Sequence, residues 1–336
     1  MKRSVVRLSI PLREPFVTAS GVLAARELLL LRLEDDDGLC GYGEAAPFEP
    51  YDGVSIESVA AALTGRAGGP RPAQARAAGE MADLDLRGRR SGRPIAEPGL
   101  EAIAVNRTLS AGPPDEVGEH AAEGVRAGYS CFKLKVGLPD DVERVAAVRA
   151  AIGPWPALRV DANGAWTPPE AIATIAALAP YDIEFVEQPC ATLAELAEVR
   201  RAVAVPIAAD EPIASASDLR AAATAEACDV VNVKLASSGG FAGARETLRA
   251  ARAHGMEPFL SSTFDGPWGI AAALQLAASE RVSLACGLAT LELFDATLAR
   301  SLRPPRHGLL AVPQGPGLGV SIDDAALAEV LVEELE

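Results

Sequence analysis

Residues 130–137 read SCFKLKVG, and four similar runs follow: PALRVDANG (156–164), IEFVEQP (183–189), VPIAADEP (205–212) and DVVNVKLASSGG (229–240). Each run is short and apolar, as expected of a buried strand, and each carries an ionisable residue at its end. In order these are Lys135, Asp161, Glu187, Asp210 and Lys234, at intervals of 26, 26, 23 and 24 positions. Such an interval holds one strand, one helix and two loops, so the stretch predicts repeated βα units.

Three further runs extend the repeat on both sides. They are AIAVNRTL (102–109), MEPFLSST (256–263) and VSLACG (282–287), and Ala-rich stretches with helical spacing lie between the runs. Strands that alternate with helices predict right-handed crossovers and a parallel sheet. Because eight such strands close a barrel, we expect an α/β fold built around a (β/α) barrel.

The N-terminal part has a different pattern. Three apolar, partly alternating runs (4–12, 27–35 and 39–47) predict an antiparallel sheet. The sequence DDDG (35–38) predicts a hairpin turn between the second and third runs. Residues 55–90 are Ala-rich with helical spacing and predict helices that pack on this sheet.

The C-terminal section loses the βα alternation. It ends in DDAALAEVLVEELE (323–336), which predicts an acidic amphipathic helix, and the section could return to the N-terminal sheet. We therefore expect three segments. They are an N-terminal α+β domain (1–100), a catalytic barrel (101–298) and a C-terminal segment that returns to the N-terminal domain (299–336).

The composition excludes several functions. The chain has 336 residues, 49% of them hydrophobic, and a formal net charge of −15. An acidic chain without basic runs is a poor nucleic-acid binder. We expect neither a signal peptide nor a membrane span. The five cysteines are far apart, which argues against disulfides and a zinc site. A cytoplasmic enzyme fits these observations, and a homo-oligomer remains possible.

The three strand-end acids predict a metal site. The carboxyl ends of parallel barrel strands meet at one rim, so Asp161, Glu187 and Asp210 should converge there. Three converging carboxylates repel one another unless a cation neutralises them, and oxygen ligands suit Mg²⁺, with Mn²⁺ possible. One isolated acid at such a position would more often cap a helix or form a rim ion pair. Three acids that end three successive strands favour the metal.

The lysines predict proton transfer. Lys133 and Lys135 are two positions apart, so their side chains point to the same face of one strand. Burying a charged lysine costs folding free energy, so two inward-pointing lysines indicate a function. Lys135 precedes the acids and Lys234 follows them, so the pair should flank a substrate bound at the metal. Proton abstraction next to the carboxylate of a small substrate then follows. The alternative is that these lysines only form ion pairs with the acids.

These motifs resemble the enolase superfamily and, within it, the muconate cycloisomerase subgroup. The resemblance rests on KLKVG (133–137), DANGAW (161–166), EQP (187–189), ADE (209–211) and KLASSGG (234–240). It covers nearly the whole chain and implies a (β/α)7β modified TIM barrel. It also implies an α+β capping domain formed by the N-terminus and the C-terminal tail, with loops near 13–24 and 46–53 closing over the barrel mouth. Asn163 and Glu211 would lie beside the metal ligands.

The last third is most similar to the o-succinylbenzoate synthases of this subgroup, which are menaquinone-pathway dehydratases. The similarity lies in the serine pair at 261–262 and in GLATLEL (287–293). It implies Mg²⁺-dependent dehydration of 2-succinyl-6-hydroxy-2,4-cyclohexadiene-1-carboxylate to o-succinylbenzoate, through an enediolate stabilised by the metal, with Lys135 as the base. Ser261 and Ser262 would line the pocket, Lys133 would support it, and Gly239 could let the backbone approach the substrate.

Other activities remain open. PLREPFVTASG (11–21) is more similar to epimerases and cycloisomerases, so a dipeptide epimerase, an N-acylamino acid racemase and a muconate-type cycloisomerase are alternatives. The segment CGLATLELFD (286–295) lacks the Asp-x-Asp pair of the dipeptide epimerases, which disfavours that reading. A barrel that binds an acidic ligand without turnover would not need two catalytic lysines.

Overall fold

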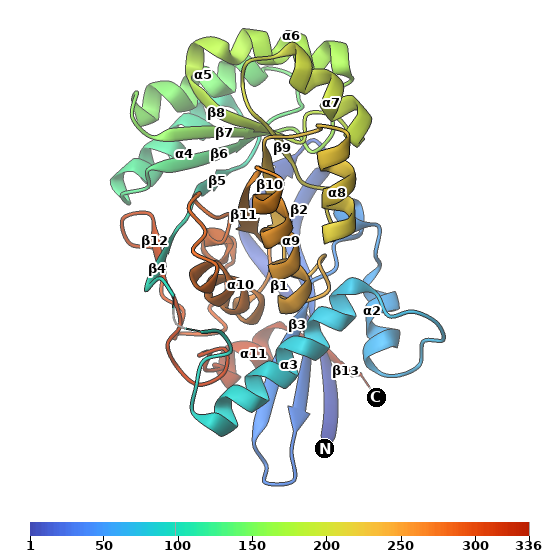
Figure 1. The fold of residues 1–336 in the computed structure, drawn as a ribbon. Helices are drawn as coiled ribbons and strands as arrows, with labels where there is room; N and C mark the ends of the chain where they lie inside the picture. Colours follow the sequence, from blue (N-terminus) through green and yellow to red (C-terminus); the bar gives the residue numbers. More distant parts are fainter. Residues whose placement is uncertain (98, 336) are drawn as a thin grey trace.

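The barrel strands form one parallel sheet. The computed structural model describes residues 1–97 and 99–335. Seven strands pair in the order β11-β10-β9-β8-β7-β6-β5, and Figure 1 shows them curving around a common centre. Their bounds are β5 (Arg107–Leu109), β6 (Cys131–Lys135), β7 (Ala157–Asp161), β8 (Ile183–Glu187), β9 (Ile207–Ala209), β10 (Val230–Lys234) and β11 (Glu257–Ser261). The predicted parallel α/β repeat is therefore confirmed.

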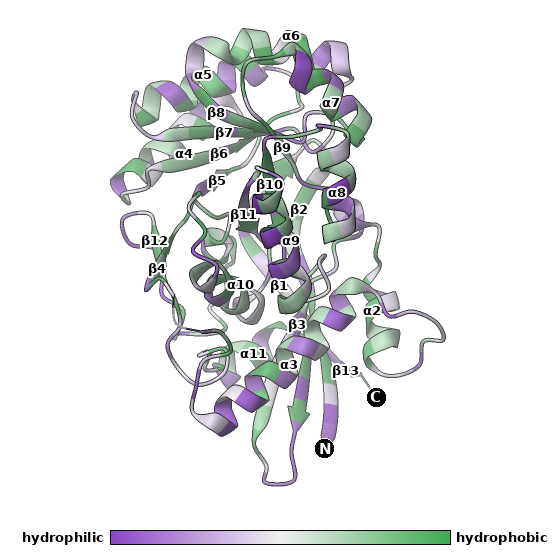
Figure 2. Ribbon diagram, viewed as in Figure 1, coloured by the Kyte–Doolittle hydropathy of each residue, from purple (hydrophilic) through white to green (hydrophobic). Residues whose placement is uncertain are grey.

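Helices connect these strands and cover the outside of the sheet. Two of them, α6 and α7, begin at capping boxes in which a threonine and a glutamate satisfy free backbone groups, Thr167 with Glu170 and Thr192 with Glu195. The helices are α4 (Pro114–Arg126), α5 (Asp141–Ile152), α6 (Pro168–Leu178), η1 (Ala179–Tyr181), α7 (Leu193–Ala202), α8 (Ala216–Thr224), α9 (Phe241–Ala253) and α10 (Pro267–Ser279). Helices α5 and α6 mix hydrophilic and hydrophobic residues in Figure 2, as expected of helices with one face on a core.

The first predicted barrel run is divided. Its first half is β4 (Ala102–Ala104), which pairs antiparallel with β12 (Leu309–Ala311), and only its second half, β5, joins the barrel. The backbone changes partner between the two halves. The N–H of Val105 donates to the carbonyl of Gly308, whereas that of Asn106 donates to the carbonyl of Cys286.

The eighth predicted strand is also corrected. Residues 282–287 make two single parallel bridges, Val105↔Cys286 and Ser261↔Gly287, instead of an extended strand. Those bridges place Cys286 and Gly287 between the 102–109 run and β11. The barrel therefore closes through seven strands and a short bridging segment. Cys286 bridges to one neighbour and Gly287 to the other, so neither side forms a longer ladder.

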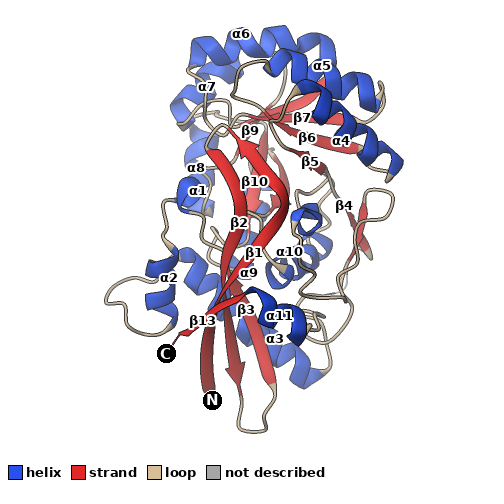
Figure 3. Ribbon diagram, turned by 180° about the vertical axis from the view of Figure 1, so that it is seen from behind, coloured by secondary structure: helices blue, strands red, loops and turns tan. Residues whose placement is uncertain are grey.

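The capping domain is built on an antiparallel sheet of order β13-β1-β2-β3. Its strands are β1 (Lys2–Thr18), β2 (Gly21–Glu34), β3 (Cys40–Ala45) and β13 (Leu331–Leu335), and its helices are α1 (Glu49–Asp52), α2 (Ile56–Leu63), α3 (Ala73–Ser91) and α11 (Asp324–Val330). The expected 13–24 loop is instead the far end of a long hairpin, which turns between Thr18 and Gly21. Figure 3 shows this β1–β2 hairpin reaching from the capping sheet to the barrel strands.

The chain end differs from the predicted helix. Helix α11 stops at Val330, and residues 331–335 form β13, which pairs antiparallel with β1. Residue 336 lies outside the described residues. The free edge of β1 offers backbone hydrogen bonds that a helical tail could not use, which accounts for the change. The predicted return of the C-terminal section to the N-terminal sheet is confirmed.

Helix α10 joins the two parts of the molecule. It contacts β3, β4 and β11, and every residue from Pro267 to Ala278 is buried. A helix that is apolar on all sides requires such a position between two layers. Next to it, η2 (Ala289–Leu293) follows the bridging segment. Among the described helices, none is long and apolar enough to cross a membrane.

Glu44 of the capping sheet caps α10 from outside the helix. Its carboxylate accepts hydrogen bonds from the backbone N–H of Gly266 at 2.6 Å and of Gly269 at 3.3 Å. Burial, together with the nearby carboxyl of Asp265, raises the pKa of Glu44 to about 8. The folded protein therefore holds a proton on Glu44 more tightly than the unfolded chain does.

This raised pKa predicts a pH-dependent stability. The stabilisation from the proton on Glu44 is fully present below the ordinary pKa of 4.5 and is lost as the pH rises through about 8. Between about pH 5 and pH 9, the wild-type protein should lose on the order of 1–3 kcal/mol more unfolding free energy than Glu44→Gln, which cannot ionise. Urea unfolding of both proteins at the two pH values measures this difference. Equal losses would contradict it.

Candidate active site

The five strand-end residues lie at one edge of the barrel. Lys135, Asp161, Glu187 and Lys234 are the last residues of β6, β7, β8 and β10, and Asp210 directly follows β9. All except Glu187 line a cavity of about 150 Å³ at this edge. The cavity also has lining residues from the capping domain, which are Thr18, Ser20, Phe48, Pro50 and Tyr51. The β1–β2 hairpin and the 46–53 segment thus cover the barrel mouth.

The three acids form a compact oxygen cluster. One carboxylate oxygen from each of Asp161, Glu187 and Asp210 lies within 4.8 Å of the other two, and all three residues are buried. The amide of Asn232 donates to Glu187 at 2.8 Å and orients it. Burial and the neighbouring acids raise the pKa of Glu187 although Lys133 opposes them. A hard divalent cation fits this set, because it takes oxygen ligands and relieves the repulsion.

Two lysines lie at the Asp161 end of the cluster. The Nζ of Lys133 is 2.8 Å from carboxylate oxygens of both Asp161 and Glu187, and the Nζ of Lys135 is 2.7 Å from Asp161. Lys135 also donates to the Oδ1 of Asn163 at 2.8 Å. Burial alone would raise the pKa of Asp161, but the two ammonium groups lower it well below its usual range.

The third lysine lies at the other end of the cluster. Lys234 forms a short ion pair with Asp210, and its Nζ lies 2.9 Å from the hydroxyl of Tyr51. That hydroxyl donates to Asp210 at 2.9 Å, and the Lys234 Nζ lies 4.4 Å from the centre of the Tyr51 ring. Lys135 and Lys234 therefore approach the three acids Asp161, Glu187 and Asp210, called the acid row below, from opposite ends.

Tyr51 is a site residue that sequence reasoning missed. It comes from α1 of the capping domain, far from the barrel motifs in sequence. The available signal was the 46–53 loop, which the family resemblance placed over the mouth without naming a residue. Its contacts with Lys234 and Asp210 depend on the packing of the capping domain on the barrel.

Asn163 and Glu211 lie beside the acids. The amide nitrogen of Asn163 donates to Glu211 at 2.9 Å while its oxygen accepts from Lys135. Burial, with Asp210 and Asp161 close by, raises the pKa of Glu211 to about 8. Asn163 thus connects the Lys135 side of the cavity to the loop after β9.

The outer predicted residues divide into two groups. Ser261 and Ser262 line the cavity, and the hydroxyl of Ser262 lies 2.8 Å from that of Thr290. Gly239 instead packs against α3, where an added Cβ would lie 2.8 Å from Arg76, and its φ of +78° is one that glycine adopts easily. Gly239 does not line the cavity, because the loop after β10 turns toward the capping helix.

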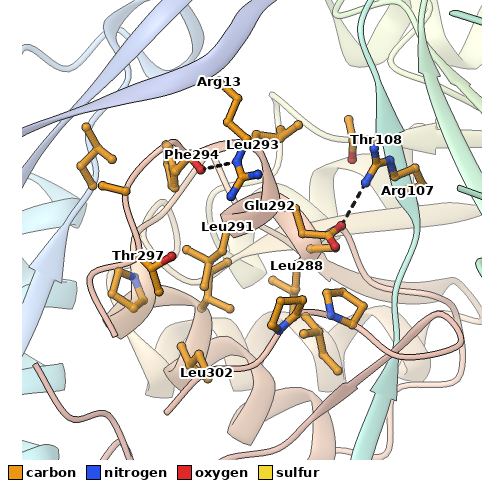
Figure 4. A pocket seen from close by; sticks show the side chains of 18 of the residues that line it. Arg13, Arg107, Thr108, Leu288, Leu291, Glu292, Leu293, Phe294, Thr297 and Leu302 are labelled. Atoms are coloured by element: carbon orange, nitrogen blue, oxygen red, sulfur yellow. Dashed lines mark hydrogen bonds and ion pairs between the residues drawn. The ribbon is translucent and has the colours of Figure 1, made fainter. Parts of the chain in front are cut away.

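A second, larger cavity adjoins the smaller one at Thr108, which lines both. It has a volume of about 660 Å³ and lies between β1, η2 and the segment that follows η2. Figure 4 shows leucines across this cavity and two arginines at its sides, with Arg13 bonded to the Phe294 carbonyl and Arg107 bonded to Glu292. It contains none of the five strand-end residues, so size alone would misplace the chemistry.

The match to a known family agrees with this geometry. Residues 116–326 match the family described as "Enolase C-terminal domain-like". The chain belongs to the enolase superfamily. That span holds all five strand-end residues, and the α/β barrel and capping sheet agree with the expected fold of the superfamily.

Similar proteins differ in their reactions. The chain is 37% identical over 333 residues to an o-succinylbenzoate synthase of Thermobifida fusca (strain YX), covering 97% of this chain and 90% of that protein. It is 30% identical over 351 residues to the L-Ala-D/L-Glu epimerase of Bacillus subtilis (strain 168), covering 94% of each. The structure of 2-chloromuconate cycloisomerase from Rhodococcus opacus 1CP superimposes with a TM-score of 0.91 at 28% identity, covering 99% of each chain. These relatives agree with the muconate cycloisomerase subgroup.

Proposed function

We propose that this enzyme is an o-succinylbenzoate synthase, a lyase that dehydrates 2-succinyl-6-hydroxy-2,4-cyclohexadiene-1-carboxylate to o-succinylbenzoate in menaquinone biosynthesis. The placement of Lys135 and Lys234 at opposite ends of the acid row carries the proposal of proton abstraction next to a carboxylate, a step that dehydration and racemisation share. Similarity to the Thermobifida fusca synthase over nearly the whole chain supports dehydration as the reaction. We expect the enzyme to work in the cytoplasm.

Asp161, Glu187 and Asp210 are proposed to hold Mg²⁺, with Mn²⁺ as a substitute. When bound, the cation would supply positive charge to the substrate carboxylate. Lys133 bridges Asp161 and Glu187 and keeps both oriented, while Asn163 and Glu211 fix the neighbouring loop. Ser261 and Ser262 are proposed to contact the substrate from the end of β11.

The proposed reaction uses Lys135 as the base. Its amine takes the proton from the ring carbon next to the carboxylate, and the electron pair of that C–H bond moves toward the carboxylate. The electrons then return to the ring as the C–O bond to the hydroxyl breaks. The departing oxygen takes that proton back from the Lys135 ammonium group and leaves as water, so the amine is restored and the ring becomes aromatic. Lys234 stabilises the negative charge from the opposite end of the acid row.

We also propose a division of labour along the chain. Residues 101–298 would supply the catalytic barrel, while 1–100 and 299–336 would form the capping domain that closes it. The lining of the cavity by Tyr51 from one part and Lys234 from the other supports this division.

The dehydration is directly testable. Purified protein with Mg²⁺ and the cyclohexadiene precursor should produce the absorbance change of an aromatic product. In liquid chromatography the product should co-elute with authentic o-succinylbenzoate. Boiled protein and protein without the precursor are the controls. If folded protein with bound Mg²⁺ leaves the precursor unchanged, the synthase proposal is wrong.

Racemisation is the second candidate. The placement of one lysine on each side of the acid row suits a two-base exchange, and similarity to the Bacillus subtilis epimerase supports it. In ²H₂O, such an enzyme would place deuterium on the α carbon of N-acylamino acids or dipeptides. Exchange without any dehydration of the cyclohexadiene would make racemisation the main activity.

A further inference from the structure

Arg26 is a buried arginine of β2 that the proposed reaction does not use. Only 3% of the residue is exposed. Its guanidinium donates to the backbone carbonyls of Ala46 at 2.7 Å, Pro47 at 2.6 Å and Thr263 at 2.9 Å. It also lies over the ring of Phe48, 5.0 Å from the ring centre. Five donors on a planar fork allow one side chain to hold several carbonyls at once.

These partners belong to two separate walls of the small cavity. Ala46, Pro47 and Phe48 begin the capping segment that carries Tyr51, whereas Thr263 follows β11 in the barrel. Phe48 and Thr263 themselves line the cavity. Arg26 therefore connects the two walls from behind, without lining the cavity.

Two buried acids lie near the guanidinium. Glu44 and Asp265 are both buried and are close enough to Arg26 to act on its charge. Asp265 accepts hydrogen bonds from the backbone and hydroxyl of Thr263 at 3.1 Å each, and Glu44 caps α10. A buried charge is retained where its partners satisfy it, and here those partners fix the end of β11.

The other end of the capping segment is fixed independently. Asp52 accepts from the amide of Gln74 on α3 at 2.7 Å and from the backbone N–H of Phe48 at 3.1 Å. The helical turn α1 is therefore held at both ends, by Arg26 before it and by Gln74 after it. Tyr51, inside this turn, meets Lys234 at 2.9 Å.

We propose that Arg26 is a positioning residue: it holds the 46–53 segment against the end of β11 and thereby keeps Tyr51 on Lys234. This inference rests on the proposed role of Lys234. When a side chain that orients a catalytic group moves by a fraction of an ångström, we expect kcat to fall more than substrate affinity does.

Arg26→Lys is the main test, with Arg26→Met as the stronger change. Lysine keeps the charge but loses the planar fork, so it cannot hold all the carbonyls. Arg32→Lys and Arg32→Met are matched controls on the same strand. The guanidinium of Arg32 is partly exposed, and its bonding partners among the described residues are Glu34 and Cys40. In the dehydration assay, kcat of Arg26→Lys should fall roughly tenfold or more, with a smaller change in KM. Both Arg32 controls should match the wild type.

Two further measurements separate positioning from general stability. Amide hydrogen exchange of peptides spanning 46–53 should accelerate in Arg26→Lys and not in Arg32→Lys. In a double-mutant cycle, Tyr51→Phe should remove most of the effect of Arg26→Lys on kcat, because both changes act on Lys234. Additive effects on kcat, unchanged exchange in 46–53, or unfolding of both Arg26 variants would overturn the proposal. If wild-type protein does not dehydrate the precursor, the function proposal fails, whereas the exchange measurement still tests Arg26.

Discussion

Replacing Lys135 with alanine is expected to lower kcat for dehydration by roughly 10²- to 10⁴-fold, the usual effect of removing a general base. Its amine is the group that accepts the ring proton in the proposed reaction. The change should not weaken Mg²⁺ binding, because Lys135 supplies no oxygen ligand and its ammonium group competes with a cation for Asp161. Steady-state kinetics and Mg²⁺ titration calorimetry measure the two quantities.

The control for this variant is Lys2→Ala. The side chain of Lys2 is 84% exposed and pairs with Glu34 far from the cavity, so its loss should change neither quantity. Circular dichroism checks that both variants fold. A Lys135→Ala protein that is folded and retains wild-type turnover would remove Lys135 from the reaction and overturn the site assignment.

Replacing Glu187 with glutamine is expected to weaken Mg²⁺ binding by roughly a hundredfold or more, beyond the effect of losing a residue that only orients a ligand. Glu187 is the middle member of the acid row. Because it is buried, water cannot easily enter to take the place of its carboxylate as a ligand. Turnover at low Mg²⁺ should fall with occupancy. Calorimetry with Mg²⁺ and with Mn²⁺ measures the loss directly.

Glu198→Gln is the matched control, since Glu198 is exposed on α7 and should bind no cation. High Mg²⁺ should restore part of the turnover of Glu187→Gln if the remaining two acids still hold the ion weakly. Unchanged Mg²⁺ affinity in a folded Glu187→Gln protein would show that the three acids do not form the metal site.

The two cavities show why chemistry locates a site better than volume does. The larger one contains none of the five strand-end residues, and two of its arginines, Arg13 and Arg107, are bonded to the Phe294 carbonyl and to Glu292. The smaller one is lined by two of the three buried acids, Asp161 and Asp210, and by three lysines, and a folded protein seldom buries such groups without a function for them. The acid row and its lysines therefore define the candidate site.

The arrangement of the acids followed from the sequence alone. Period and order placed Lys135, Asp161, Glu187, Asp210 and Lys234 at successive strand ends, and parallel strands end at one rim by geometry. Their convergence needed no knowledge of side-chain packing. Local patterns also predicted the hairpin at 35–38 and the helices within 55–90, because turn residues and helical spacing act over a few positions.

Contacts between distant segments were decided only by the tertiary structure. Tyr51 meets Lys234 and Arg26 meets Thr263 across sequence separations that no local pattern encodes. The same holds for β13, which becomes a strand because β1 has a free edge, and for Gly239, which turns toward α3 instead of the cavity. Sequence periodicity thus determined the barrel and the convergence of its charged residues, because each strand and each helix is indicated by a pattern of only a few neighbouring residues. The cover of the cavity depended on how the capping domain packs, since burial and hydrogen bonding there are shared between segments that meet only in the folded chain.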